Sequence, residues 1–379
     1  MYIPYGRQCI SEEDIQAVVD TLRSDYLTTG PKISEFEKVI ADYTGAKYAV
    51  AVSNGTAALH IACMAAGISE GDEVITSPIT FVASANCSFY CGATPIFADI
   101  DLDTYNISSE SIEKCITDKT KAIVAVHFSG QPCDMDRIRE IADKHNLIVI
   151  EDAAHALGAD YKSKKIGSIS DMTTFSFHPV KHITTAEGGM VTTNNKELYE
   201  KLLLYRTHGI TRDSELMSKN DGAWYYEQID LGYNYRITDV QCALGMSQMK
   251  RLDEFVSKRR ELVARYNKAF ENVDEIITPY QLAGCNNSYH LYVIRLNTMD
   301  RKEVFDKLRA AGIGVNVHYI PVHTQPYYKR YYEENKMAQP ECPNAIKYYN
   351  TAISLPLYPE LSYEQQDYVI EKVVQSVMV

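Results

Sequence analysis

The chain has 379 residues, of which 45% are hydrophobic and 23% are charged, as in a globular protein and unlike a disordered one. Its 38 basic and 50 acidic side chains give a formal net charge of −12, which disfavours nucleic acid as a partner because that binding needs a basic surface. No run of about 18 apolar residues occurs, so we expect no membrane-spanning segment.

The first half of the chain alternates short apolar runs with helical patterns. An N-terminal helix is predicted after Ser11, because Asp14 follows three residues later and apolar residues then recur at helical spacing. Strands are predicted at 48–52, 73–76, 95–98, 122–126, 147–150 and 173–177, and helices at 56–66, 81–90, 109–116 and 134–145. Apolar strands separated by helices are typical of a mostly parallel sheet covered on both faces.

The second half follows a different pattern. The polar, aperiodic segment 211–230 predicts a long loop, and the apolar face that runs from Ile237 to Val256 predicts one long helix. A strand at 289–296, a helix at 302–311 and a strand at 315–319 come next, and Ser362 with Gln365 forms the capping box of a last helix. We place a domain boundary near residue 255, which gives a large domain at 1–255 and a smaller one at 256–379.

Nine cysteines are spread along the chain without a CxxC pair, and Met1–Gln8 lacks the apolar core of a secretory signal. We therefore expect reduced thiols and a cytoplasmic protein. No histidine or second cysteine pair accompanies Cys87 and Cys91, so no metal is expected. The sequence also lacks a GxxxxGK[ST] loop, and Val317 stands where a GxGxxG motif starting at Gly312 needs its third glycine.

Three motifs carry groups that could do chemistry, and two of them directly follow a predicted strand. Gly55 and Thr56 begin a helix after the strand at 48–52, where free backbone amides could bind an anion or where Asn54 could simply cap the helix. Asp152 and His155 follow the strand at 147–150, either as functional groups or as a structural cap. Lys181 follows Pro179 and Val180, where poor solvation would lower its pKa and make it a nucleophile, although an isolated lysine is more often a surface residue.

Together, these groups match what a protein supplies to pyridoxal phosphate. A phosphate site, a carboxylate for the pyridine nitrogen and a lysine for the aldehyde are the three requirements. Phe81, which comes after the strand at 73–76, could cover a face of the ring.

The chain resembles the DegT/DnrJ/EryC1/StrS group of sugar-nucleotide aminotransferases over nearly its whole length. The resemblance rests on an ordered set of motifs: Leu27–Pro31, Ser53–Leu59, Glu151–His155, Ser176–Gly189, Arg206–Gly209 and Gly232–Arg236. It implies the type I, aspartate aminotransferase-like fold of pyridoxal phosphate enzymes, with a mostly parallel central sheet and a smaller α/β C-terminal domain.

The resemblance also implies roles for individual residues. Lys181 would bond to the cofactor and move the proton, and Asp152 would pair with the pyridinium nitrogen. Phosphate binding is implied for Gly55, Thr56 and Ser176, ring stacking for Phe81, and contact with the ring for His155. Asn234 and Arg236 would reach the cofactor phosphate and the substrate from the second subunit of a homodimer with shared active sites.

Within this family, the chain is most similar to the 4-aminotransferases of the pseudaminic-acid pathway, on the segments Phe175–His178, Ile183–Gly189 and Val317–Tyr319 with Pro321. This implies transfer of an amino group from L-glutamate, through pyridoxamine phosphate, to C4 of a UDP-linked 4-keto-6-deoxy-N-acetylhexosamine. The sugar-nucleotide site would comprise Tyr5, Tyr26, Leu27, Thr28, His318 and Tyr319, although His318 could simply pack. Arg236 would bind the substrate as a candidate for the glutamate carboxylate, or could form an interface salt bridge.

Three alternatives stay open. The substrate could be another nucleotide-linked sugar with a keto group at C3 or C4. Some members of the family are dehydratases with histidine at the lysine position, and His182 adjoins Lys181, although counting from Ser176 places Lys181 in register. A non-catalytic protein that kept the fold is the third alternative, against which the intact set of Asp152, Lys181 and Ser176 argues.

Overall fold

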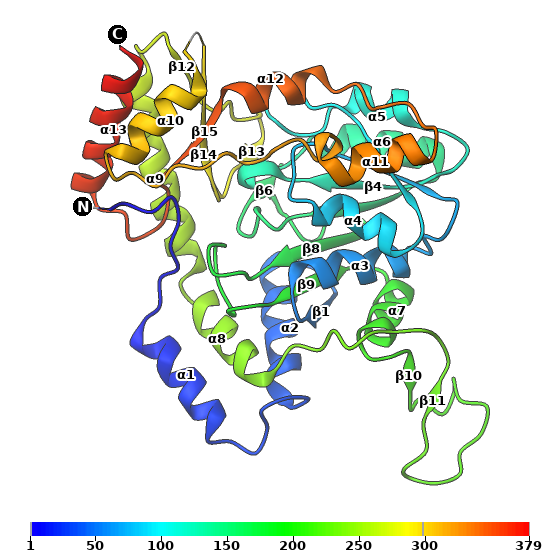
Figure 1. The fold of residues 1–379 in the computed structure, drawn as a ribbon. Helices are drawn as coiled ribbons and strands as arrows, with labels where there is room; N and C mark the ends of the chain where they lie inside the picture. The colour runs from blue at the N-terminus through cyan, green and yellow to red at the C-terminus, as the bar shows by residue number, and fades with distance from the viewer. Residues whose placement is uncertain (1, 298, 379) are drawn as a thin grey trace.

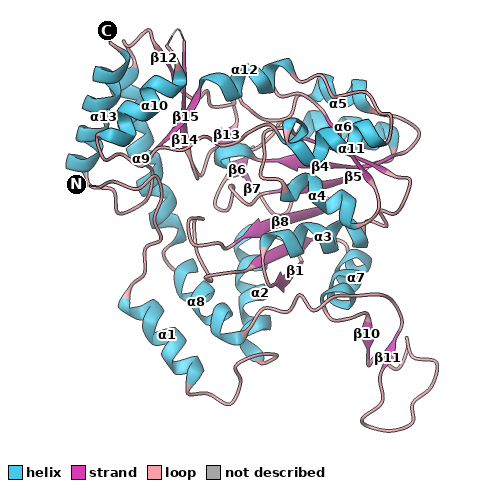
Figure 2. Ribbon diagram, in the orientation of Figure 1, coloured by secondary structure: helices cyan, strands magenta, loops and turns pink. Residues whose placement is uncertain are grey.

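A seven-stranded sheet forms the centre of the larger part of the molecule (Figures 1 and 2). In the computed structural model, which describes residues 2–297 and 299–378, the strand order is β1-β9-β8-β5-β4-β2-β3. Within this sheet β9 runs antiparallel to both neighbours, and the remaining adjacent pairs are parallel. The strands are Tyr48–Val52 (β1), Glu73–Thr76 (β2), Thr94–Phe97 (β3), Thr120–Val126 (β4), Ile148–Asp152 (β5), Met172–Ser176 (β8) and Gly189–Thr193 (β9). The predicted mostly parallel sheet is confirmed, although β9 was not predicted.

Helices cover both faces of this sheet because its strands are apolar on both sides. In β1, Val50 and Val52 join the apolar cluster on one face, whereas Ala49 and Ala51 join the cluster on the other. The first face is covered by α3 (Gly55–Ala65), α4 (Ala83–Tyr90) and α7 (Lys196–Arg206). The second face is covered by α2 (Pro31–Thr44), α5 (Ser109–Cys115), α6 (Met135–His145) and α8 (Asp239–Met249). The resulting three-layered arrangement places the carboxyl ends of the parallel strands at one edge.

The N-terminal helix α1 (Glu12–Leu22) has the predicted cap, because Asp14 N donates to Ser11 Oγ and Ser11 N donates back to the Asp14 carboxylate. The single long helix predicted after Ile237 is wrong. The chain instead forms α8 and a separate helix α9 (Leu252–Phe270), with Arg251 between them. The Arg251 guanidinium donates to the buried Asp14 carboxylate. The helix therefore breaks next to a residue that makes a tertiary contact, and the spacing of the apolar residues does not indicate this break.

The C-terminal part forms a second, smaller sheet with strand order β12-β14-β15, packed with α9, α10 and α13 (Figure 1). Its elements are β12 (Ile276–Ile277), β14 (Tyr292–Leu296), β15 (Ala352–Leu355), α10 (Arg301–Ala310) and α13 (Tyr363–Val377). The capping box of Ser362 and Gln365 is confirmed. The strand predicted at 315–319 is wrong: Asn316 makes an isolated bridge with Ser354, and the regular ladder of β15 is formed with β14.

Residues 322–351 return to the larger part of the molecule. They form η2 (Val322–Thr324), α11 (Pro326–Glu334) and α12 (Pro343–Thr351), drawn in orange in Figure 1. Tyr328 and Tyr348 are buried in one cluster with Ile79 and Phe97. The helix α9 also runs through residue 255 without a break. A division of the chain at residue 255 stays a prediction.

The segment predicted as a long loop at 211–230 is largely irregular. It projects from the body of the molecule (Figure 1) and contains a short pairing of β10 (Ile210–Thr211) with β11 (Glu227–Gln228). Trp224 within it is 74% exposed. The remaining elements are η1 (Phe128–Gly130) and a small sheet of β6 (Asp160–Tyr161), β7 (Lys164–Lys165) and β13 (Cys285–Asn286). Across the described residues, we find no helix with the length and apolar character needed to cross a membrane.

Candidate active site

A cavity of about 840 Å³ lies where β1, β2, β5 and β8 end. Open α/β sheets bind ligands at this edge, because the strand ends and the following loops and helix N-termini meet there. Ten residues predicted from the sequence line the cavity: Tyr5, Gly55, Thr56, Phe81, Asp152, His155, Ser176, Lys181, His318 and Tyr319. The fold therefore brings together groups that lie more than 300 positions apart in sequence.

Lys181 is held in the cavity by the loop that joins β8 to β9. Phe177 N donates to the Gly188 carbonyl, and Thr185 N donates to the Phe177 carbonyl, at 2.9 and 3.0 Å. These bonds close the loop at its base. Lys181 N in turn donates to the His178 carbonyl. The neighbouring His182 is 3% exposed, and its Nε2 lies 3.1 Å from the Ser288 carbonyl, so its ring is directed into the protein. Lys181, and not His182, lines the 840 Å³ cavity.

The amine of Lys181 is activated by its surroundings. Burial lowers the pKa of Lys181 to about 8, and the negative charge of Asp152 acts in the opposite direction. A larger fraction of this amine is therefore neutral near neutral pH than for an exposed lysine. A neutral amine has the lone pair that attacks a carbonyl carbon.

Asp152, the last residue of β5, is 6% exposed and has donors on both carboxylate oxygens. Its Oδ2 accepts from Ser84 Oγ at 2.5 Å, and its Oδ1 accepts from Ala154 N at 3.1 Å. These donors fix the carboxylate in the cavity wall. A fixed carboxylate can hold a proton on a ring nitrogen placed opposite it.

His155 lies on the turn after β5 and is 6% exposed. Burial lowers the pKa of His155 well below its ordinary value, and the charge of Lys181 acts in the same direction, so the ring is neutral. Its Nδ1 accepts from Ser129 N at 3.3 Å, which leaves the proton on Nε2, 3.3 Å from Tyr319 Oη. His155 is thus a neutral hydrogen-bond donor in the cavity wall.

Gly55 and Thr56 form the N-terminus of α3, directly across from Ser176 at the end of β8. Asn54 caps this helix by accepting from Ala57 N at 2.8 Å. A Cβ atom on Gly55 would lie 2.9 Å from Ser176 Cβ, so only glycine keeps this corner of the cavity open. The free amides and the Ser176 hydroxyl are the donors that a phosphate group requires.

Aromatic and polar groups also line the cavity. Tyr5 lies against His318, with ring centroids 5.4 Å apart, and Phe81 lies 6.4 Å from Tyr319. His318 Nδ1 is 2.8 Å from Ser354 Oγ, and burial lowers the pKa of His318 to about 4, so His318 is neutral at neutral pH. Phe81 is 59% exposed despite its apolar ring, so its ring is available to a ligand.

Five of the residues predicted for binding do not line this cavity. Tyr26, Leu27 and Thr28 are exposed, and the Leu27 carbonyl accepts from Asp239 N at the start of α8. Asn234 and Arg236 flank Tyr235, which does line the cavity, but neither of them does so. Their roles stay predictions.

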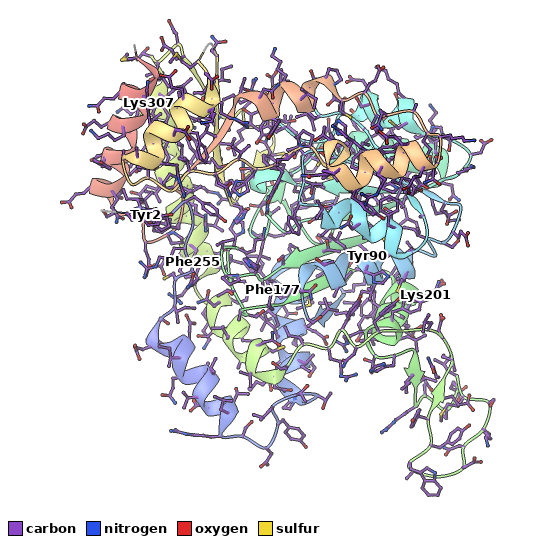
Figure 3. All side chains as sticks on the ribbon, in the orientation of Figure 1. Tyr2, Tyr90, Phe177, Lys201, Phe255 and Lys307 are labelled. Atoms are coloured by element: carbon purple, nitrogen blue, oxygen red, sulfur yellow. The ribbon has the colours of Figure 1, made fainter. Side chains whose placement is uncertain are left out.

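The structure adds lining residues that the sequence analysis did not single out: Thr80, Ser84, Tyr90, His290 and Asn316. Tyr90 ends α4 and is labelled in Figure 3. Ser84 lies one helical turn beyond Phe81, which is the one sequence signal that could have indicated it. His290 and Asn316 come from the C-terminal half, and nothing in their local sequence indicates a cavity.

Comparisons with known proteins give full-length matches. The spore coat polysaccharide biosynthesis protein SpsC of Bacillus subtilis is 45% identical over 98% of this chain and 96% of its own. The UDP-4-amino-4,6-dideoxy-N-acetyl-beta-L-altrosamine transaminase of Campylobacter jejuni (strain 81-176) is 40% identical over 97% and 95%. Among solved structures, Helicobacter pylori PseC, an aminotransferase involved in pseudoaminic acid biosynthesis, is 32% identical with a TM-score of 0.92, covering 100% of this chain and 99% of its own.

The residues around the cavity fit pyridoxal phosphate. The N-terminus of α3 with Ser176 suits the phosphate, Asp152 suits the ring nitrogen, and Lys181 suits the aldehyde. A putative sugar aminotransferase of Streptococcus pneumoniae, Spr1654, is 33% identical with a TM-score of 0.91 and full coverage of both chains, and its structure is known in the PLP-form.

A family model described as the DegT/DnrJ/EryC1/StrS aminotransferase family matches residues 8–374. That range includes nine of the ten predicted residues that line the cavity, and Tyr5 is the exception. The chain therefore belongs to the DegT/DnrJ/EryC1/StrS family and is a pyridoxal phosphate-dependent aminotransferase.

Proposed function

We propose that this enzyme transfers the amino group of L-glutamate to C4 of a UDP-linked 4-keto-6-deoxy-N-acetylhexosamine. The observation that carries an amino-transfer reaction is the Lys181 amine, with its pKa lowered to about 8, in one cavity with the doubly hydrogen-bonded Asp152. The relatives named as a UDP-sugar transaminase and as PseC support the sugar-nucleotide substrate.

In this proposal each of four cavity residues has a separate role. Lys181 would hold the cofactor by condensing with its aldehyde, with release of water, and the amine, once displaced by the amino donor, would move the proton during amino transfer. Asp152 would hold a proton on the ring nitrogen, and the cofactor, when bound, would supply an electron sink. His155 would lie beside the ring with its Nε2 proton as a donor, and Phe81 would cover a face of the ring.

The sugar nucleotide lies against Tyr5, His318 and Tyr319, which line the cavity. Aromatic faces and neutral hydrogen-bonding groups suit a sugar ring. A bound nucleotide diphosphate needs cationic donors, and Lys181 is the single lysine or arginine among the described residues that line this cavity.

We infer that a second copy of the chain completes the site, as the roles proposed for Asn234 and Arg236 require. Arg236 adjoins Tyr235 in the cavity wall yet does not line the cavity of its own chain. Apolar side chains are exposed nearby, with Leu231 at 66% and Tyr90 at 50%. A homodimer with shared sites would cover such side chains and supply the guanidinium that binds the glutamate carboxylate.

A spectroscopic assay tests the amino-transfer reaction. Addition of L-glutamate to the holoenzyme is expected to remove the visible absorbance band of the bound cofactor, and a UDP-linked 4-keto sugar is expected to restore it. Lys181→Ala removes the amine and is expected to lack the native band. A native band and normal turnover in that variant would contradict the role of Lys181.

A substrate screen tests the specific sugar. The enzyme, loaded with amino group from L-glutamate, is offered UDP-, GDP- and dTDP-linked keto sugars, and each product is identified by mass and NMR. The proposal predicts a 4-amino product from the UDP-linked 4-keto-6-deoxy-N-acetylhexosamine.

The 45% identity with SpsC favours, as a second candidate, a different nucleotide-linked keto sugar for a surface polysaccharide. Amino transfer to such a sugar, with none to the UDP sugar, would select that candidate. Loss of water from the sugar would instead identify a dehydratase.

A further inference from the structure

Two buried hydroxyl groups form consecutive hydrogen bonds that end at the Asp152 carboxylate. Ser84 Oγ lies 2.5 Å from Asp152 Oδ2, and Thr80 Oγ1 lies 2.7 Å from Ser84 Oγ. Ser84 and Thr80 are 1% and 3% exposed, so these hydrogen bonds lie in a medium where they are stronger than in water. Both side chains come from the segment that follows β2 and enters α4.

The Asp152 carboxylate, at the end of this series of hydrogen bonds, determines which group donates in each bond. An ionised carboxylate can only accept, so Ser84 donates to Asp152, and Thr80 donates to Ser84. The Phe81 carbonyl is a second acceptor for the Ser84 hydroxyl, but at 3.3 Å it is the longer contact. Thr174 also lines the cavity, yet its Oγ1 donates to the Glu151 carbonyl at 3.2 Å. Ser84 is therefore the hydroxyl that supports Asp152.

We propose that Ser84, backed by Thr80, is a positioning residue that orients the Asp152 carboxylate and draws off part of its negative charge, so that the proton stays on the ring nitrogen of the cofactor. The proposal rests on the proposed role of Asp152 as partner of that nitrogen. With Ala154 N on Oδ1 and Ser84 on Oδ2, the carboxylate plane is fixed, and each oxygen keeps a lone pair for another donor.

Loss of the Ser84 hydroxyl would act on the shared proton in two ways that have the same sign. A carboxylate without this donor holds more charge and pulls the proton from the ring nitrogen more strongly. It is also freer to rotate away from that nitrogen. Both effects make the ring nitrogen less protonated.

The experiment is nitrogen NMR of the holoenzyme, reconstituted with pyridoxal phosphate carrying ¹⁵N in its ring. In Ser84→Ala the ring signal is expected to move toward the position of unprotonated pyridine, by less than in Asp152→Asn. Ser84→Thr keeps a hydroxyl and is expected to return the signal to the wild-type position. Thr80→Val removes the second hydroxyl at nearly constant shape and is expected to give a smaller shift of the same sign.

The variants separate the possible failures. An unchanged signal in Ser84→Ala, with a shifted signal in Asp152→Asn, would overturn the role of Ser84 and leave that of Asp152 intact. An unchanged signal in Asp152→Asn would instead remove the role of Asp152 on which the proposal rests. If Ser84→Ala fails to fold or to bind the cofactor, Thr80→Val decides, and a wild-type signal in it overturns the proposal.

Discussion

At the scale of single residues, the lowered pKa of Lys181 predicts how cofactor binding depends on pH, which can be tested without any substrate. If Lys181 bonds to the cofactor aldehyde as proposed, its amine must first be neutral, and burial lowers its pKa to about 8. The neutral form is lost as the pH falls through that value. We therefore expect the rate at which the apoprotein recombines with pyridoxal phosphate to rise with pH and level off, with a midpoint near 8. Stopped-flow absorbance measures this rate.

Asp152 provides the control for this pH profile. Its charge raises the pKa of Lys181 and so opposes the effect of burial. In Asp152→Asn the opposing charge is gone, and the midpoint is expected to move below that of the wild type. A wild-type midpoint at the ordinary value of lysine, about 10.4, would show that burial does not govern the amine.

At the scale of elements, a buried pair joins the end of β4 to β5. His127 Nε2 lies 2.7 Å from Glu151 Oε2, and both side chains are fully buried. Cys133 N donates to His127 Nδ1, which leaves the proton on Nε2 to be donated to Glu151. His127→Leu would leave the Glu151 carboxylate buried without this donor. We expect it to lower the free energy of unfolding by about 2–4 kcal/mol, measured by urea denaturation of the apoprotein.

The matched control for His127→Leu is an exposed pair on the neighbouring helix α6. Arg137 and Glu140 are paired there with side chains 46% and 66% exposed. Because solvent screens such pairs, Arg137→Ala is expected to change the free energy of unfolding by less than about 1 kcal/mol. An equally small effect of His127→Leu would show that Glu151 does not need His127 as a hydrogen-bond donor.

The elements also show how far the sequence could predict the fold. The strands β1 and β2 match their predicted ranges, because runs such as Tyr48–Val52 are apolar on both faces and have abrupt ends. β9 was not predicted, since Gly189 and two threonines give it little apolar pattern. The predicted strand at 315–319 has apolar residues but no regular ladder, because pairing depends on which partner strand is free.

The candidate site, like the fold, could be predicted from the sequence only in part. Asp152 and Ser176 stand at strand ends, Lys181 in a loop after a strand and Gly55 at the start of a helix after a strand. Local motifs carry their chemistry, and the structure places all four in one cavity. Asn316 and the two-hydroxyl support of Asp152 depend on contacts between distant segments or on side-chain direction. Neither leaves a periodic signal in the sequence.

At the scale of the whole molecule, the proposed sharing of active sites between two subunits predicts how mixed dimers behave. Two variants, Lys181→Ala and Arg236→Ala, are each expected to be inactive. If Arg236 serves the partner subunit's cavity, their heterodimer has one site with both residues intact and one site with neither. Co-expression with two different tags and tandem purification should then give a heterodimer with about half of the wild-type activity.

The alternative arrangement predicts no recovery at all. If Arg236 served the cavity of its own chain, every site in that heterodimer would lack one of the two residues. A heterodimer of Lys181→Ala with Asp152→Asn is the matched control, because both residues line the same chain's cavity and no intact site can form. Recovery in the first pairing but not in the second would therefore assign Arg236 to the partner's site. Inactivity in both pairings would contradict the shared site.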